Sequence, residues 1–141
     1  MLTQATITTM LPVKDMERAR CFYEGRLGFH PDGGARVDGR FEYDCGGGRI
    51  ALIPRAGGSK AEHTALSFEV RDIGSRIREL QEAGVVFEDY DLPGLKTVEH
   101  VCVLGSEKAA WFRDSEGNFL CLHEAGTQQP VFLPLPEGEA P

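Results

Sequence analysis

Several features that identify particular classes of protein are missing from this chain of 141 residues. No apolar run approaches the roughly 18 residues that a membrane span needs, and no basic segment followed by an apolar one opens the sequence. The four cysteines, Cys21, Cys45, Cys102 and Cys121, contain no C-x-x-C pair. We therefore expect free thiols, with no disulfide framework or structural zinc site, in a cytoplasmic protein that does not contact membranes.

Positive charge is also scarce. The sequence has 15 Lys and Arg against 22 Asp and Glu, a formal net charge of −7. Because nucleic-acid phosphates require a basic face, no nucleic-acid partner is expected. A Ser-His-Asp arrangement, a paired-carboxylate motif and a glycine-rich phosphate loop are likewise missing. The acidic balance is typical of a solubility device, and a negatively charged groove for a cationic ligand is the alternative.

What the sequence does contain is a repeat. Val13-Lys14-Asp15-Met16 and Val70-Arg71-Asp72-Ile73 share one pattern, and the second copy begins 57 positions after the first, at 70 instead of 13. Each copy follows an apolar strand pattern and opens an amphipathic helix that stops at a glycine. This duplication predicts one pseudo-symmetric domain whose two units close around a central cleft.

The periodicity predicts two helices and a series of strands. The helices begin after Asp15 and Asp72, both good N-caps. The strands are predicted at 5–13, 40–45, 49–54, 62–70, 85–90, 98–104, 108–113 and 118–124. Residues 91–97 are an insertion relative to the first unit.

These elements predict a single domain, residues 1–124, made of units at about 5–54 and 61–124. Residues 125–141 form a tail that carries four of the eight prolines, at 130, 134, 136 and 141. A tail of this composition either lies in extended form along the domain or is disordered.

Three segments carry a resemblance to a known family: LPVKDMERARCFYEGRLGF, ALSFEVRDI and AAWFRDSEGNFLCLHE. Together they resemble the vicinal oxygen chelate superfamily, which includes glyoxalase I, bleomycin resistance proteins and extradiol dioxygenases. The resemblance implies an α+β fold with two βαβββ modules in tandem, whose mixed sheet curves into a cup with the helices outside. It also implies a homodimer in which the partner chain lines part of the cleft.

In metal-using members of this superfamily, four strand positions facing into the cup supply His, Glu or Gln ligands. The corresponding positions of this chain are Thr8, Ala51, Ala65 and Cys121. Alanine has no donor atom, a neutral threonine is a poor ligand, and one cysteine cannot hold a metal ion alone. The resemblance therefore implies a protein without a metal cofactor.

A displaced metal site is the alternative. Strand alternation places His63 on the face of Ala65, His123 on the face of Cys121, and Arg49 on the face of Ala51. His63, His123 and Cys121 could together bind zinc, or another divalent metal such as nickel, iron or manganese. Without a metal, the same three side chains remain candidates for an acid, a base or a nucleophile.

The features that indicate ligand binding are aromatic. Trp111 and Arg113 alternate onto one face of their predicted strand, with Phe112 on the other, so one ring packs on the helices and one can stack on a ligand. Tyr43 and Tyr90 offer similar contacts. An acidic rim for a cationic ligand could come from Glu42, Asp44, Glu88, Asp89 and Asp91.

These observations favour a metal-independent small-molecule-binding protein that sequesters a cationic or aromatic compound. The alternatives are a metal-dependent lyase, isomerase or dioxygenase, in which a divalent ion chelates vicinal oxygens, and an accessory module with a vestigial cleft. Whether the chain is an enzyme stays open. The predicted ligand cleft comprises Thr8, Arg49, Ala51, His63, Ala65, Trp111, Arg113, Cys121 and His123.

Overall fold

The computed structural model describes residues 1–126, and the predictions for the tail at 127–141 lie outside the described residues. The chain has mixed α+β structure, as predicted. The first unit contains β1 (Thr8–Val13), α1 (Met16–Arg20) with its π-helical continuation η1 (Cys21–Arg26), β2 (Phe41–Cys45) and β3 (Gly48–Pro54). The second contains β4 (Thr64–Glu69), α2 (Ile73–Glu82), β5 (Asp91–Leu92), β6 (Leu95–Lys96), β7 (Cys102–Leu104), β8 (Glu107–Arg113) and β9 (Phe119–Glu124).

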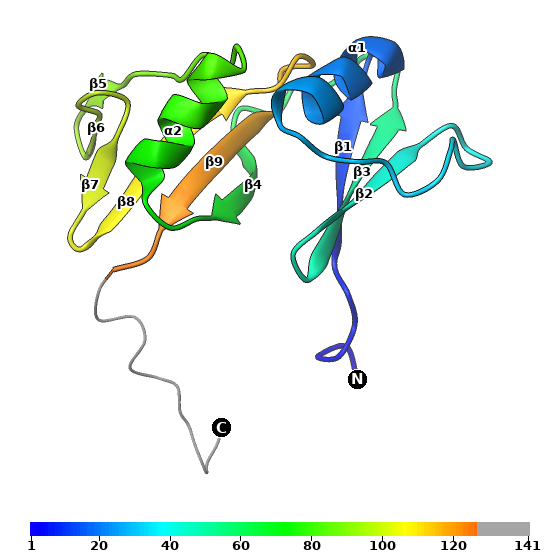
Figure 1. The fold of residues 1–141 in the computed structure, drawn as a ribbon, viewed down its shortest axis with the longest axis horizontal. Helices are drawn as coiled ribbons and strands as arrows, with labels where there is room; N and C mark the ends of the chain where they lie inside the picture. The colour runs from blue at the N-terminus through cyan, green and yellow to red at the C-terminus, as the bar shows by residue number, and fades with distance from the viewer. Residues whose placement is uncertain (127–141) are drawn as a thin grey trace.

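The two units repeat one strand connectivity. In the sheet of order β1-β3-β2, the first strand is parallel to the last, and the last is antiparallel to the strand before it. The sheet of order β4-β9-β8-β7 has the same arrangement. Helix α1 packs on β3 and α2 on β8 and β9. Within residues 1–126, the opposite face of each sheet carries no helix (Figure 1).

Both helices begin where the sequence predicts. The Asp15 side chain accepts a hydrogen bond from the backbone N–H of Arg18, and Asp72 accepts one from Ser75. These bonds satisfy donors that the first turn of a helix leaves free. The first helix then widens, because the N–H of Leu27 bonds to a carbonyl five residues back. No helix in the described range is long and apolar enough to cross a membrane.

One predicted strand is largely wrong, and two others begin later than predicted. The segment 85–90 pairs only through a single bridge between Phe87 and Phe112, and the predicted insertion at 91–97 is the hairpin β5–β6. The hydroxyl of Thr97 accepts a hydrogen bond from the backbone N–H of Tyr90. That N–H is therefore not free to pair with a neighbouring strand. Strand β7 starts only at Cys102, because the two residues at 99 and 100 adopt left-handed backbone angles that interrupt an extended chain. The first predicted strand also starts later, at Thr8.

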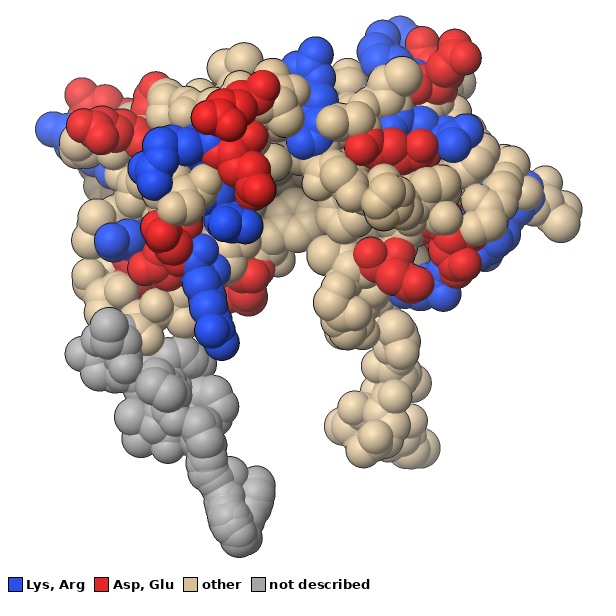
Figure 2. Space-filling model, viewed as in Figure 1, with Lys and Arg blue, Asp and Glu red and all other residues tan. Residues whose placement is uncertain are grey.

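One apolar core joins the two units. Phe22 of the first unit lies 6.5 Å from Phe112 of the second between ring centroids, and Phe29 lies 6.1 Å from Phe68. Both Phe22 and Phe112 are buried. Figure 2 shows acidic and basic side chains interleaved over the upper part of the molecule, with a hollow lined mostly by uncharged residues beneath the junction of the units.

A buried carboxylate also fastens the units together. The Oε1 atom of Glu116, in the turn between β8 and β9, accepts hydrogen bonds of 2.9 Å from the backbone N–H groups of Lys14 and Asp15. The Arg18 side chain donates to both carboxylate oxygens. Burial alone would raise the pKa of Glu116, but these donors lower it to about 2. The turn therefore caps the junction of β1 and α1 with a carboxylate that is charged at neutral pH.

Candidate functional site

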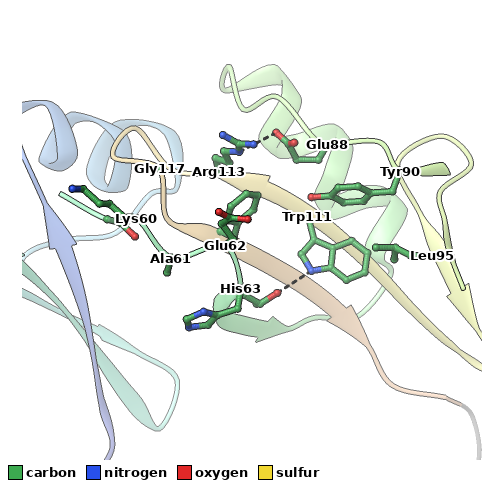
Figure 3. A pocket seen from close by; sticks show the side chains of 13 residues that line it. Lys60, Ala61, Glu62, His63, Glu88, Tyr90, Leu95, Trp111, Arg113 and Gly117 are labelled. Atoms are coloured by element: carbon green, nitrogen blue, oxygen red, sulfur yellow. Dashed lines mark hydrogen bonds and ion pairs between the residues drawn. The ribbon is translucent and has the colours of Figure 1, made fainter. Parts of the chain in front are cut away.

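The candidate site is a cavity of about 690 Å³ on the helix-free face of the second sheet. The segment 59–64, which leads into β4, forms one wall, and Trp111 and Arg113 of β8 form the floor (Figure 3). Phe119 of β9 also lines the cavity. Glu88, Tyr90 and Leu95 close the far side. This volume is in the range of pockets that hold small organic molecules.

Trp111 dominates the floor of the cavity. Residues alternate along β8, so Phe112 is fully buried in the core while Trp111 stays half-buried on the open face. The indole Nε1–H donates a 3.2 Å hydrogen bond to the hydroxyl of Thr64, and the ring of Tyr90 packs edge-to-face with a centroid distance of 5.8 Å. Because indole has one donor and that donor is used, a ligand meets the ring itself.

The cavity presents charges of both signs. Arg113 stacks on Phe119, with the guanidinium carbon 4.5 Å from the ring centroid, and its Nε lies 3.8 Å from the Glu88 carboxylate. Lys60 and Glu62 stand on the opposite wall (Figure 3). The lining therefore has no excess of negative charge.

The acidic rim predicted for a cationic ligand is not assembled. Glu42 and Asp44 lie on the first sheet, where Arg49 sits 3.0 Å and 3.6 Å from their carboxylates. Asp89 is paired with His100 at 3.0 Å. Of the five predicted carboxylates, only Glu88 lines the cavity. The rim could not be predicted because alternation gives the face on which each carboxylate lies, but not the arginine that lies beside it on a neighbouring strand.

The four positions that carry metal ligands in the superfamily do not form a donor set here. Thr8 is exposed, Ala51 is fully buried and Ala65 is half-buried. Cys121 is buried, and burial raises the pKa of its thiol, so the thiolate form that ligates and attacks is disfavoured. Within residues 1–126, no three His, Cys, Asp or Glu side chains converge on a point that could hold a metal ion. The residues present do not fit the family's metal.

The displaced alternative does not assemble either. His123 Nδ1 lies 2.7 Å from Glu69, and Nε2 lies 2.5 Å from Glu107, so both ring nitrogens already have carboxylate partners. The imidazole of His63 points away from Trp111 (Figure 3). With both nitrogens of His123 occupied, neither is available to take a proton from Cys121.

The structure brings only part of the predicted site together. His63, Trp111 and Arg113 line the cavity, whereas Arg49 borders a smaller space of about 160 Å³ between the units. Tyr90 lines the cavity, but Tyr43 is fully buried. The residues predicted to line the cleft did not include the segment 59–62, Thr64, Leu95 or Phe119. Alternation from Cys121 could have found Phe119, two positions earlier on the same face.

The two hydrogen bonds of His123, to Glu69 and Glu107, make the stability of the protein depend on pH. Hydrogen bonds to Glu69 and then Glu107 raise the pKa of His123, so its stabilising effect is full below its unfolded pKa of about 6.5 and disappears as pH rises through the folded pKa. His123→Gln should therefore destabilise the protein more at about pH 6 than at about pH 10. Urea denaturation at both pH values measures the free energy of unfolding. An equal loss of stability at both pH values would contradict a stabilising role for the two hydrogen bonds of His123.

The fold and cavity define the class of protein. Two units with the same strand connectivity pack around one core, and an open sheet face carries an aromatic cleft. The chain belongs to the Glyoxalase/Bleomycin resistance protein/Dioxygenase superfamily, whose family model matches residues 6–122. The resemblance seen in the sequence is thus confirmed. No curated protein sequence matches the chain.

Solved structures share the fold. A member of the superfamily from Sphaerobacter thermophilus is 24% identical, with a TM-score of 0.69, and the match covers 89% of this chain and 100% of that one. TnmS3, an antibiotic binding protein from Streptomyces sp. CB03234, is 22% identical, with a TM-score of 0.66 and coverage of 89% and 99%. The fosfomycin resistance protein FosX from Listeria monocytogenes is 14% identical, with a TM-score of 0.62 and coverage of 88% and 93%. At these identities the likeness establishes the fold alone.

Proposed function

We propose that this protein binds a small aromatic molecule in the Trp111 cleft without the help of a metal ion. The observation that carries the proposal is the indole of Trp111, held by Thr64 and Tyr90 on the floor of a 690 Å³ cavity. Its hydrogen bond and its edge-to-face contact fix the ring before a ligand arrives. Because the ring is already fixed, binding a flat ligand does not require the side chain to lose further conformational entropy.

Metal independence is supported by the chemistry of the donor positions. Ala51 and Ala65 have no donor atom, and burial disfavours the thiolate of Cys121. Two solved relatives are described as an antibiotic binding protein and a fosfomycin resistance protein. Sequestration of a toxic aromatic compound is the role that we propose for this chain by analogy.

We further propose that the working form is a cytoplasmic homodimer in which a second copy covers part of the helix-free face. Met10 supports this, because this large apolar side chain of β1 is 49% exposed and alternates away from the buried Leu11 and Val13. Apolar groups in such a position are typical of a surface that is covered in an assembly.

The test uses the only tryptophan of the chain as its reporter. Planar aromatic compounds, with neutral 2-naphthamide as the reference probe, are titrated into the protein while Trp111 emission is followed. Stacking on the indole should quench emission in a saturable way and raise the melting temperature, since a ligand that binds only the folded state stabilises it. No saturable change with any planar compound would contradict the proposed function.

A further inference from the structure

A second cavity adjoins the Trp111 cleft. It has a volume of about 430 Å³ and lies between η1 and the segment 84–88. Glu88 and Arg113 line both spaces, so the pair forms their common wall. The side chain of Arg113 can therefore meet a ring that rests on Trp111 and also a group held in the second cavity.

The second cavity is basic, in contrast to the protein as a whole. Three arginines line it (Arg18, Arg26 and Arg113), against the single carboxylate of Glu88. Arg18 is already neutralised by Glu116. Arg113 approaches Glu88 only to 3.8 Å, which is too long for a hydrogen bond. Within residues 1–126, the side-chain hydrogen bond of Arg26 goes to a neutral backbone carbonyl, that of Gly84. Two guanidinium groups are thus left with hydrogen-bond donors to offer.

The backbone holds Arg26 in this position. Its Nη1 donates a 2.5 Å hydrogen bond to the carbonyl of Gly84. Gly84 has a φ of +98°, and a Cβ added there would lie 2.8 Å from the same Nη1 atom. A side chain at position 84 would therefore push the guanidinium away, so the glycine leaves room for Arg26 as well as allowing the left-handed turn.

We infer that the ligand of the Trp111 cleft is an aromatic anion, with its ring on Trp111 and its carboxylate or phosphate group received by Arg113 and Arg26. This inference rests on the proposed function and adds the charge of the ligand. Arg113 stands two positions along β8 from Trp111 on the same face, about 7 Å away. A planar guanidinium with free N–H groups is suited to bidentate contact with either anion.

The experiment compares two probes that share a ring and differ in charge. The affinities of 2-naphthoate and neutral 2-naphthamide are measured by calorimetry for the full chain and for Arg113→Gln, Arg26→Gln and Glu88→Gln. The matched control is Arg76→Gln, which removes an exposed guanidinium on α2. The naphthoate should bind about fivefold or more tightly than the amide, a preference typical of charge-assisted hydrogen bonds.

The expected pattern is specific. Arg113→Gln and Arg26→Gln should each reduce the ratio of naphthoate affinity to amide affinity, and Glu88→Gln should increase that ratio. Arg76→Gln should leave both affinities unchanged. Equal binding of the two probes, tighter binding of 2-naphthylmethylammonium, or a preference that survives both arginine substitutions would overturn this inference alone. Failure of every probe to bind would overturn it together with the proposed function.

Discussion

Trp111→Ala is expected to weaken the binding of 2-naphthamide by about 30-fold, which corresponds to about 2 kcal/mol. The indole is the floor of the cleft and is fixed by Thr64 and Tyr90, so its removal eliminates the stacking surface. Alanine cannot replace a planar contact. Calorimetry is the appropriate measurement, because the substitution also removes the only source of tryptophan emission.

Two controls separate stacking from damage to the fold. His63→Ala changes another residue of the cleft, whose imidazole points away from Trp111 (Figure 3), and should cost less than about threefold in affinity. Lys108→Ala changes an exposed residue of the same strand outside the cavity and should have no effect. Equal losses for Trp111→Ala and His63→Ala, at unchanged stability, would contradict the stacking interpretation.

Glu116→Ala is expected to destabilise the protein by about 3 kcal/mol, because it removes a shielded acceptor that two backbone N–H groups and one guanidinium share. The N–H groups of Lys14 and Asp15 both donate to this carboxylate, and Arg18 forms a two-point contact with it. The Glu116 side chain is fully shielded from solvent, whereas that of Arg18 is 52% exposed. The arginine can therefore recover hydration after the substitution, so the loss is smaller than the sum of all the hydrogen bonds to the carboxylate.

Denaturation in urea measures this effect, with Glu79→Ala as the control. Glu79 pairs with Arg76 on the surface of α2, with its side chain 64% exposed, and its loss should cost less than about 0.5 kcal/mol. The pH dependence gives a second check. Because the folded pKa of Glu116 is lowered to about 2 from an ordinary 4.5, its contribution is present above pH 4.5 and declines as pH falls toward 2. A difference between wild type and Glu116→Ala that stays constant over this range would contradict the role assigned to the carboxylate.

Local patterns in the sequence were sufficient to predict the repeat and the first residues of both helices. Asp15 and Asp72 cap their helices because a short carboxylate next to a helix start reaches the N–H three residues on. Alternation also separated Phe112, which is buried, from Trp111 on the open face. These features depend on neighbours in sequence, which is why they could be predicted.

The features that could not be predicted depend on contacts between distant residues. At 85–90, strand propensity is overridden because the Thr97 hydroxyl accepts the hydrogen bond of the Tyr90 N–H. At 98–101, it is overridden by the left-handed backbone of Glu99 and His100. The capping of the β1–α1 junction by Glu116 spans about a hundred residues of sequence and leaves no local pattern. Residues 59–61 lie between the predicted strands at 49–54 and 62–70, so no local pattern marked them as a wall of the cleft.

Ligand binding at Trp111 is expected to need no metal ion. The most direct test measures metal content by elemental mass spectrometry on protein purified without chelators and then repeats the 2-naphthamide titration with and without a chelator. We expect less than about a tenth of an ion per chain, even after exposure to zinc, nickel, iron and manganese, and the same affinity in both titrations. About one tightly held ion per chain, with binding lost on chelation, would contradict this expectation and make His63 and His123 the first ligands to examine.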